Sequence, residues 1–393
     1  MTLLTRLPTL LPLERLTLPE ELDGKNGTNR THLSHAQIAA QTDTDAIKAW
    51  LARYVDTRTT LESYRKEAER LLLWSTIECG KPLSSLTHED LLLYQRFLSD
   101  PQPVARWVMP AGRKWSRFDP AWRPFAGPLS PTSQRQSIVI LNTMFSWLVT
   151  AGYLAGNPLA LSRQRQRKAK PRITRFLEDP LWEEIKTTIA VMPRETEREH
   201  EHAVRVRWLF SLLYLCGLRI SEVTQNTMGA FFCRRDPGSE ERWWLEILGK
   251  GDKTRLIPAT DELMIELARY RRENALPPFP VPGESTPLLL PIGGKRRPMT
   301  RSAVHLIVKE VFLRAAARIR ERGPEFDHLA SRVEEASAHW LRHTAGSRMA
   351  NEMDLRIVRD NLGHASLSTT SHYLHTEDDL RHQQTEQHHR IKW

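Results

Sequence analysis

The stretch LGHASLSTTSHY, residues 362–373, places a histidine nine residues ahead of a tyrosine and fills the gap with small and hydroxylic residues. Leu362-Gly363 is typical of a helix end, and SLSTT predicts the start of a short helix that leads to Tyr373. A tyrosine at this position is compatible with plain core packing. Phenol becomes a useful nucleophile only where nearby cations stabilise its anion, so the basic motifs elsewhere in the chain decide how this stretch is interpreted.

Length and composition limit the classes of protein to which the chain can belong. Its 393 residues suffice for two or three domains, and 40% apolar with 26% charged residues is ordinary for a globular protein. An excess of 57 Lys+Arg over 47 Asp+Glu gives a net charge of +10, which favours a polyanionic partner, nucleic acid first. Three widely spaced cysteines without a CxxC pair predict neither disulfides nor a thiolate zinc site, and they fit a cytoplasmic protein. The sequence has no apolar run long enough for a membrane span, so we expect no membrane partner.

Helical periodicity covers about residues 44–160 and predicts a bundle of four amphipathic helices. Thr87 followed by Asp90 resembles a capping box, Pro131 opens the last helix, and Gly152 ends it. Residues 1–43 form a Leu-rich arm that prolines and charges interrupt. Its role is open, because the sequence is compatible both with a docking segment and with a disordered tail.

Two basic segments adjoin this bundle. Residues 101–130 contain six prolines and three tryptophans, which suits either contact with nucleic acid or a loop folded back with its tryptophans buried. Residues 161–175 form a linker without a single acidic residue, and we expect it to lie along DNA phosphates, because each contact releases counterions. Its basic residues are Arg163, Arg165, Arg167, Lys168, Lys170, Arg172 and Arg175.

Beyond residue 176 the pattern is again mainly helical, with one interruption at WWLEILGKGDKTRLIPA, residues 243–259. Strand-type residues flank a tight GKGDK turn, which predicts a β-hairpin. The second domain, residues 176–393, is therefore expected to be mainly α with a small sheet. Lys250 occupies the hairpin tip, and Lys253 and Arg255 add to its charge. Such a tip is either a solvated turn or a group of cations that reaches DNA.

The stretch LLYLCGLRISEV, residues 212–223, predicts an apolar helical face that extends to Gly217, with Arg219 at its end. Glu222 lies three residues further on and can satisfy the Arg219 guanidinium as a structural ion pair. A guanidinium held in this way can still present its remaining donors to a phosphate in a fixed fork. Both interpretations stay open for this motif alone.

The stretch AHWLRHTAGSRMA, residues 338–350, places His339, Arg342 and His343 on one helical face. The His339-x-x-x-His343 spacing is similar to that of a zinc protease helix, but the glutamate that such a site uses as a base is absent. A cation beside the two histidines also opposes metal binding. We therefore predict no metal site here.

Taken in order, GLRISE, LGKGDKTR, HWLRHT and LGHASLSTTSHYLH closely resemble the signature segments of the tyrosine recombinase, or phage integrase, family. The resemblance implies a helical core-binding, SAM-like domain at residues 44–160 and an α+β catalytic domain, which together form a C-shaped clamp on DNA. It implies that Tyr373 attacks a DNA phosphate to leave a 3′-phosphotyrosyl link.

The resemblance also implies roles for the other motif residues. Arg219 and Arg342 would bind the non-bridging oxygens, and Lys250 would protonate the leaving 5′-oxygen. His339 would be the general base, His364 would orient the phosphate, and Glu222 would support Arg219. Lys253 and Arg255 would contact DNA. Neither a cofactor nor a metal ion is implied.

The resemblance implies double-stranded DNA as the partner and a tetramer of protomers during synapsis. Residues 376–393 are the candidate segment for exchange between protomers, and a related recombinase or an accessory protein is a possible further partner. We expect a site-specific recombinase that acts as the integrase or resolvase of a mobile element. Three alternatives remain: a relaxing enzyme similar to type IB topoisomerases, a DNA-binding regulator that does not cut, and, more distantly, a zinc hydrolase built on His339 and His343.

Overall fold

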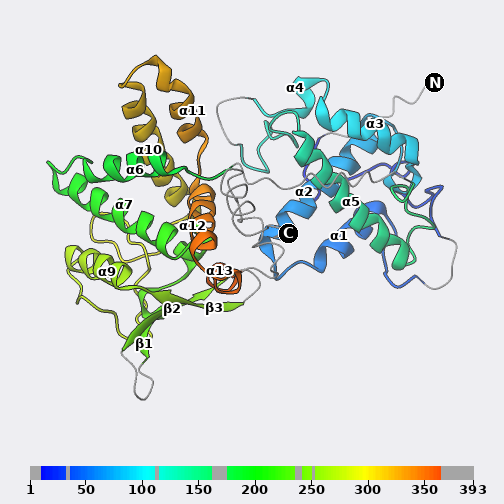
Figure 1. The fold of residues 1–393 in the computed structure, drawn as a ribbon. Helices are drawn as coiled ribbons and strands as arrows, with labels where there is room; N and C mark the ends of the chain where they lie inside the picture. Colours follow the sequence, from blue (N-terminus) through cyan, green and yellow to red (C-terminus); the bar gives the residue numbers. More distant parts are fainter. Residues whose placement is uncertain are drawn as a thin grey trace, which may run out of the picture. The chain divides into compact units, whose positions relative to one another are not determined.

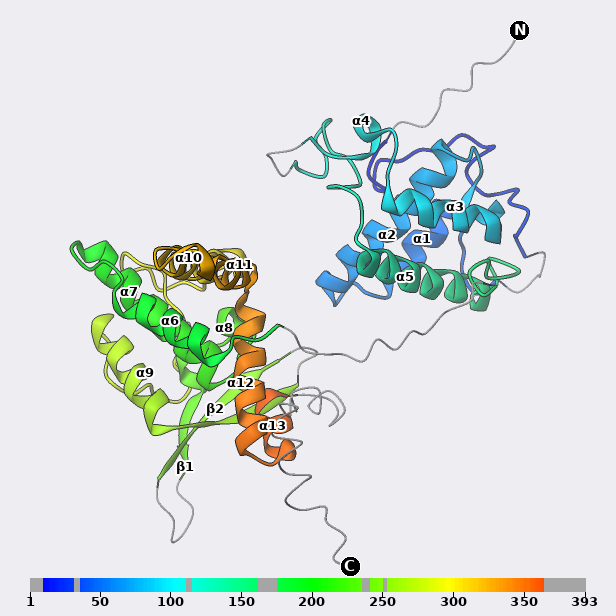
Figure 2. The ribbon, with the colours of Figure 1, turned by 45° about the horizontal axis from the view of Figure 1, so that its top comes forward.

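The computed structural model describes residues 10–31, 36–110, 115–161, 175–234, 241–249 and 253–363. The chain divides after Arg167 into two compact units, and the described part of each has its own hydrophobic core. Figures 1 and 2 show that the described residues are mainly helical, with a small sheet in the second unit. This confirms the predicted fold class. No helix among the described residues is long and apolar enough to cross a membrane.

The first unit is built on the four helices that the periodicity predicted. These are α1 (Asp43–Ala52), α2 (Arg58–Ile77), α3 (His88–Ser99) and α5 (Pro131–Thr150), with a short additional helix α4 (Val104–Trp107). The predicted capping box of α3 is confirmed, because the Thr87 backbone N–H donates to Asp90 Oδ2 at 3.0 Å and the Asp90 N–H donates to Thr87 Oγ1. Pro131 occupies the first turn of α5, as predicted.

The described part of the N-terminal arm packs on its own bundle. Leu13 and Leu16 are buried in the core of the first unit, and the Leu13 N–H donates to Glu69 at 2.6 Å. Arg117 forms ion pairs with both Glu14 of the arm and Glu69 of α2. Of the two interpretations left open for the arm, the docking segment is the one that residues 10–31 follow.

The proline-rich segment 101–130 also folds back on the bundle where it is described. Trp107 is fully buried, and its indole N–H donates to Glu78 Oε1 at 2.8 Å. Phe125 is buried beside it, and Val108 pairs with Phe125 in an isolated β-bridge. A buried indole without a partner would be costly, so the Glu78 contact explains how a tryptophan in so polar a segment joins the core.

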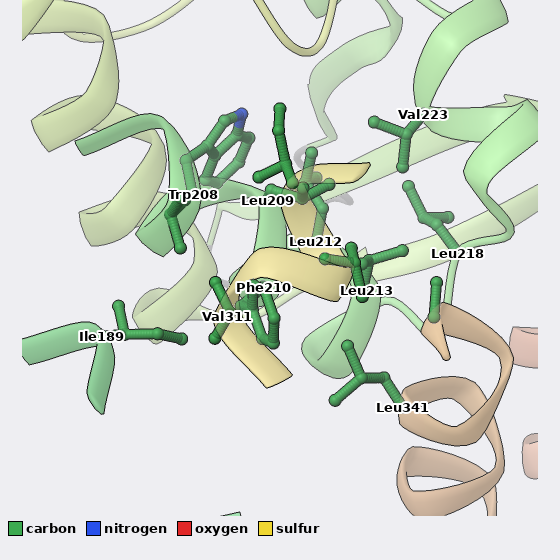
Figure 3. Close-up of a cluster of buried hydrophobic side chains, with 14 of the residues drawn as sticks. Ile189, Trp208, Leu209, Phe210, Leu212, Leu213, Leu218, Val223, Val311 and Leu341 are labelled. Atoms are coloured by element: carbon green, nitrogen blue, oxygen red, sulfur yellow. The ribbon is translucent and has the colours of Figure 1, made fainter. Parts of the chain in front are cut away.

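In the second unit the helices and the sheet share one core, with the sheet along one edge of the unit (Figures 1 and 2). Its helices are α6 (Asp179–Ala190), α7 (Glu197–Leu215), α8 (Ile220–Gln225), α9 (Asp261–Glu273), α10 (Arg301–Arg320), α11 (Asp327–Glu335), α12 (Ala338–Glu352) and α13 (Leu355–Leu362). Figure 3 shows the core, in which Leu209 and Leu213 of α7 gather with Val311 of α10 and Leu341 of α12. Because nine of the residues of α7 are buried, the turn that follows it is attached to a rigid, well-packed helix.

The sheet is antiparallel, with the order β1 (Phe231–Arg234), β2 (Arg242–Leu248) and β3 (Thr254–Ala259). The hairpin of β2 and β3 confirms the prediction for residues 243–259. Strand β1 was not predicted: it is four residues long, and it joins the sheet because the buried Phe231 lies opposite Leu245. So short a run carries little alternation of its own.

Candidate active site

Arg219 stands at the start of α8, directly after the chain turns away from α7. Helix α7 ends at Leu215, and Gly217 has φ +56°, so Gly217 lies in the turn and not on the helical face on which we placed it. The Arg219 backbone N–H donates to Glu222 Oε2 at 2.9 Å, and its Nη1 donates to Oε1 at 2.8 Å. The Arg219 side chain is 37% exposed, so the fork is held by a carboxylate and still faces solvent.

Glu222 is 2% exposed, and it forms an ion pair with a second arginine, Arg255. Arg255 Nη1 donates to Glu222 Oε1 at 2.8 Å, and Nη2 donates to Oε2 at 2.9 Å. Burial by itself raises the pKa of Glu222. The hydrogen bonds and charge of Arg255, together with the backbone N–H and charge of Arg219, outweigh burial and lower the pKa to about 2. Glu222 is thus ionised at neutral pH and links two guanidiniums.

Arg255 differs from the exposed hairpin cation that the sequence suggested. Its side chain is only 10% exposed, and its Nε donates to the backbone carbonyl of Asn361 at 3.0 Å. The physical reason is the alternation of side chains along β3, which places Arg255 on the inward face with the buried Ile257 and Ala259. That alternation was the signal in the sequence that could have placed this side chain inside. Lys253, by contrast, is exposed.

Arg342 is buried within α12 and is 1% exposed. Its Nη1 donates to the carbonyl of Gly217, and its Nη2 donates to the carbonyl of Leu362. Leu362 is the last residue of α13, where helical carbonyls lack partners and the helix dipole is negative, and Gly217 lies in the turn that follows α7. Arg342 therefore fastens two helix ends together and brings its charge to the place where they meet.

His339 lies in the first turn of α12 and keeps an exposed edge. Partial desolvation of its ring lowers its pKa, and the charges of Arg342, Arg219 and Arg175 lower it further. His339 is thus mainly unprotonated at pH 7, and it lies one helical turn before Arg342 on α12. The ring centroids of His339 and His343 are 4.2 Å apart, and the two ring planes meet at 71°, which is an edge-to-face contact. Within the described ranges, no group of three or more His, Cys, Asp or Glu residues is placed to hold a metal ion.

Three motif glycines allow three of the four motifs to approach one another closely. A Cβ at Gly217 would lie 2.7 Å from Leu362 Cδ2, and a Cβ at Gly363 would lie 2.7 Å from Arg255 Cδ. A Cβ at Gly249 would lie 3.4 Å from Glu222 Oε1. Gly363 also has φ +64° and closes α13, which confirms the predicted helix end. The glycines mark where the backbone of one motif packs directly against a side chain of another, a role that single motifs do not reveal.

Several residues singled out in the sequence fall outside the described ranges. These are Lys250, His364, Tyr373, Arg163, Arg165, Arg167, Lys168, Lys170, Arg172 and the segment 376–393. Arg175 is described and exposed. The structure therefore brings together Arg219, Glu222, His339 and Arg342, and it adds Arg255 to them.

The sequence model of the phage integrase family matches residues 183–379, which is half of the chain. The chain belongs to this family. The match begins within α6 and continues beyond α13, so it includes every described residue of the site.

Other members of the phage integrase family align over most of the chain. The tyrosine recombinase XerC of Agrobacterium fabrum is 28% identical over 333 residues, which cover 83% of this chain and 88% of the relative. The tyrosine recombinase XerD of Neisseria meningitidis serogroup B is 26% identical over 294 residues, 74% of this chain and 88% of the relative. The protein is accordingly a tyrosine recombinase, an enzyme that cleaves and rejoins DNA by transesterification.

Solved structures share the fold of this tyrosine recombinase. The XerH site-specific recombinase bound to palindromic difH substrate, a post-cleavage complex, gives a TM-score of 0.57 at 18% identity and covers 90% of this chain and 91% of that chain. The Tn1549 transposon integrase in complex with transposon right end DNA gives 0.55 at 17% identity, with 88% and 98% covered. At these identities the likeness establishes the fold.

Proposed function

We propose that this tyrosine recombinase is the site-specific integrase or resolvase of a mobile element and works through a 3′-phosphotyrosyl intermediate on Tyr373. One observation carries the proposal. Arg219 comes from one motif and His339 and Arg342 from another, and the two motifs meet where Arg342 donates to the carbonyl of Gly217, two residues before Arg219. The charges of both arginines lower the pKa of His339. Two cations and a neutral base in one place suit attack on a phosphodiester.

The two arginines have different parts in this proposal. Arg219 presents an exposed fork, so it binds the non-bridging oxygens on which negative charge accumulates during attack. Arg342 is fixed by the carbonyls of Gly217 and Leu362, so its charge is pre-organised where the helix ends meet. The ion pair of Arg219 with Glu222 supports its orientation, because a fork held on one side loses less freedom when it binds phosphate.

His339 acts as the general base that takes the phenolic proton from Tyr373. Its lowered pKa supports this role, because the imidazole is then unprotonated at neutral pH. Lys250 donates a proton to the 5′-oxygen as the P–O5′ bond breaks, and His364 hydrogen-bonds the phosphate. Rejoining is the reverse transesterification, in which a 5′-hydroxyl attacks phosphorus and Tyr373 leaves. The energy of the phosphodiester is retained in the tyrosyl ester, so the cycle is balanced without a nucleotide cofactor.

The other tyrosines support Tyr373 as the nucleophile. The chain has seven tyrosines, and six are described. Burial raises the pKa of Tyr94, Tyr153, Tyr214 and Tyr270, which makes their phenolate forms less accessible. Tyr54 and Tyr64 pack against each other and against Trp50 in the first unit. None of the six belongs to the site, and Tyr373 is ten residues beyond Gly363.

Double-stranded DNA is the proposed substrate and partner. Relatives in complex with difH substrate and with transposon right end DNA support it, as does the net charge of +10. The basic segment 161–175 and Lys253 add phosphate contacts along the backbone. We further propose that four protomers assemble on two duplexes and exchange residues 376–393.

The proposal is tested by trapping the covalent intermediate on a nicked duplex that carries the target site. The wild-type protein should form an SDS-resistant adduct in the presence of EDTA. Tyr373→Phe should form none, whereas the matched control Tyr54→Phe, in the first unit, should form as much as wild type. An adduct that persists in Tyr373→Phe would reassign the nucleophile. Dependence on a divalent metal would favour the zinc hydrolase alternative.

A second assay separates recombination from the other functions of the fold. Two target sites on one supercoiled plasmid should yield exchanged products with wild-type protein. Relaxation of supercoils without exchange would identify a topoisomerase-like enzyme. Binding without either product, and without adduct, would identify a DNA-binding regulator.

A further inference from the structure

Two arginines hold the C-terminal end of α13, just before the segment that carries His364 and Tyr373. Arg342 Nη2 donates to the carbonyl of Leu362, and Arg255 Nε donates to the carbonyl of Asn361 at 3.0 Å. Carbonyls in the last turn of a helix have no partner within the helix, and cations are favoured there. Side chains from β3 and α12 therefore hold Asn361 and Leu362, the last two residues of α13.

Arg255 is the member of this pair that also reaches other parts of the site. Its Nη1 and Nη2 donate to both carboxylate oxygens of Glu222, and the same carboxylate receives two donors of Arg219. One guanidinium thus joins strand β3, helix α8 and the end of α13. With its side chain 10% exposed and Nε, Nη1 and Nη2 each donating to protein oxygens, it is poorly placed to serve as a surface contact for DNA.

Two glycines, Gly363 and Gly249, allow the backbone to lie close to the Arg255 side chain. A Cβ on Gly363 would lie 2.7 Å from Arg255 Cδ and 3.2 Å from Nε, so only glycine allows the end of α13 to lie against it. On the other side, a Cβ on Gly249 would lie 3.5 Å from Arg255 Nη1. Gly249 precedes Lys250, and Gly363 precedes His364. Arg255 therefore packs between the backbone positions from which these two motif residues depart.

We propose that Arg255 is a positioning residue that holds Gly249 and Gly363, the residues before Lys250 and His364 in the sequence, in fixed positions relative to the Arg219–Glu222 pair. The inference rests on the proposed function and adds a residue to it. Positioning by Arg255 depends on the planar fork, because two parallel bonds to Glu222 and a third to Asn361 come from one rigid group. A lysine at this position supplies the charge, but its single ammonium cannot donate to both oxygens of Glu222 and to the carbonyl of Asn361 with the same geometry.

The test compares Arg255→Lys and Arg255→Gln with the exposed α9 control Arg272→Gln in single-turnover cleavage of the nicked duplex at saturating DNA. Arg255→Lys keeps a cation beside Glu222, so it should stay folded and lower the melting temperature less than Arg255→Gln does. Both Arg255 variants should nevertheless cleave about 10- to 100-fold more slowly, since small misplacements of reacting groups have effects of this size. Their DNA affinity and its salt dependence should match those of wild type and Arg272→Gln.

Hydrogen exchange provides a second readout that does not depend on cleavage. The Gly363 amide donates within the last turn of α13, and it should exchange faster in both Arg255 variants, whereas amides of α9 should not change. Rescue of cleavage by lysine, or unaltered exchange at Gly363, would overturn the positioning role. A fall in affinity and in salt slope with an unchanged rate would overturn it in favour of a direct DNA contact. If the wild-type protein forms no adduct, the proposed function fails, whereas the exchange result still stands on its own.

Discussion

Glu222 and Arg255 form a bidentate ion pair, with Nη1 2.8 Å from Oε1 and Nη2 2.9 Å from Oε2. The same carboxylate receives Nη1 and the backbone N–H of Arg219. Two guanidiniums, those of Arg219 and Arg255, therefore share one carboxylate. The excess of positive charge suits a phosphodiester whose negative charge increases during attack.

Replacing Glu222 with glutamine should remove a pH-dependent part of the stability. The folded pKa of Glu222 is about 2 against an ordinary value of 4.5, so its contribution is complete above about pH 4.5 and disappears as the pH falls toward 2. The shift corresponds to about 3 kcal/mol at neutral pH. Urea unfolding followed by tryptophan fluorescence should show Glu222→Gln less stable at pH 7, with a gap that narrows below pH 4.5. If wild type and Glu222→Gln differed by the same free energy of unfolding at pH 7 and at pH 3, the lowered pKa of Glu222 would be refuted.

The cleavage rate should depend on pH through His339. Its lowered pKa means that the neutral base persists below pH 6.5, so the acid limb of single-turnover cleavage should lie below that value. The Arg175 charge is one cause of the lowering, so Arg175→Gln should move the acid limb upward, measured at saturating DNA. Arg272→Gln is the control and should leave the limb in place. A limb that moves downward in Arg175→Gln would contradict the role of His339.

Gly363→Ala should be more harmful than alanine at a glycine of similar backbone conformation. Gly363 has φ +64° and Gly294 has φ +69°, so both substitutions carry the cost of a positive φ, about 1 kcal/mol. Only at Gly363 does the added Cβ meet a neighbour, Arg255 Cδ at 2.7 Å, whereas it meets nothing within 4 Å at Gly294. We expect Gly363→Ala to lose further stability and to slow cleavage. Equal melting temperatures and cleavage rates for the two variants would contradict this packing.

The N-terminal arm should contribute to the stability of the first unit. Leu13 is 3% exposed and Leu11 is 37% exposed, only two residues apart. Leu13→Ala should lower the free energy of unfolding by about 2–5 kcal/mol because it opens a cavity in the core. Leu11→Ala should lower it by less than about 1 kcal/mol. Similar losses for both, in urea unfolding of the full chain, would mean that the arm does not dock in solution.

Local signals in the sequence were sufficient for much of this fold. The Thr87–Asp90 capping box, Pro131, the hairpin alternation and Gly363 each act within a few residues, and each predicted its element correctly. The partners of Arg342 could not be predicted in this way, because the carbonyls of Gly217 and Leu362 meet it only after α7, α12 and α13 have packed. Arg255 could have been predicted in part. The alternation of residues in β3 places it on the same face as Ile257 and Ala259, but the neighbouring cations suggested an exposed turn.

Peptide mapping of the trapped adduct tests the central claim most directly. Trypsin should release residues 360–381 as one peptide, in which Tyr373 is the only tyrosine. After nuclease digestion of the nicked-duplex adduct, fragmentation by mass spectrometry should place a 3′-linked nucleotide on Tyr373. A nucleotide on any other side chain, or an unmodified peptide recovered from an SDS-resistant adduct, would contradict the account.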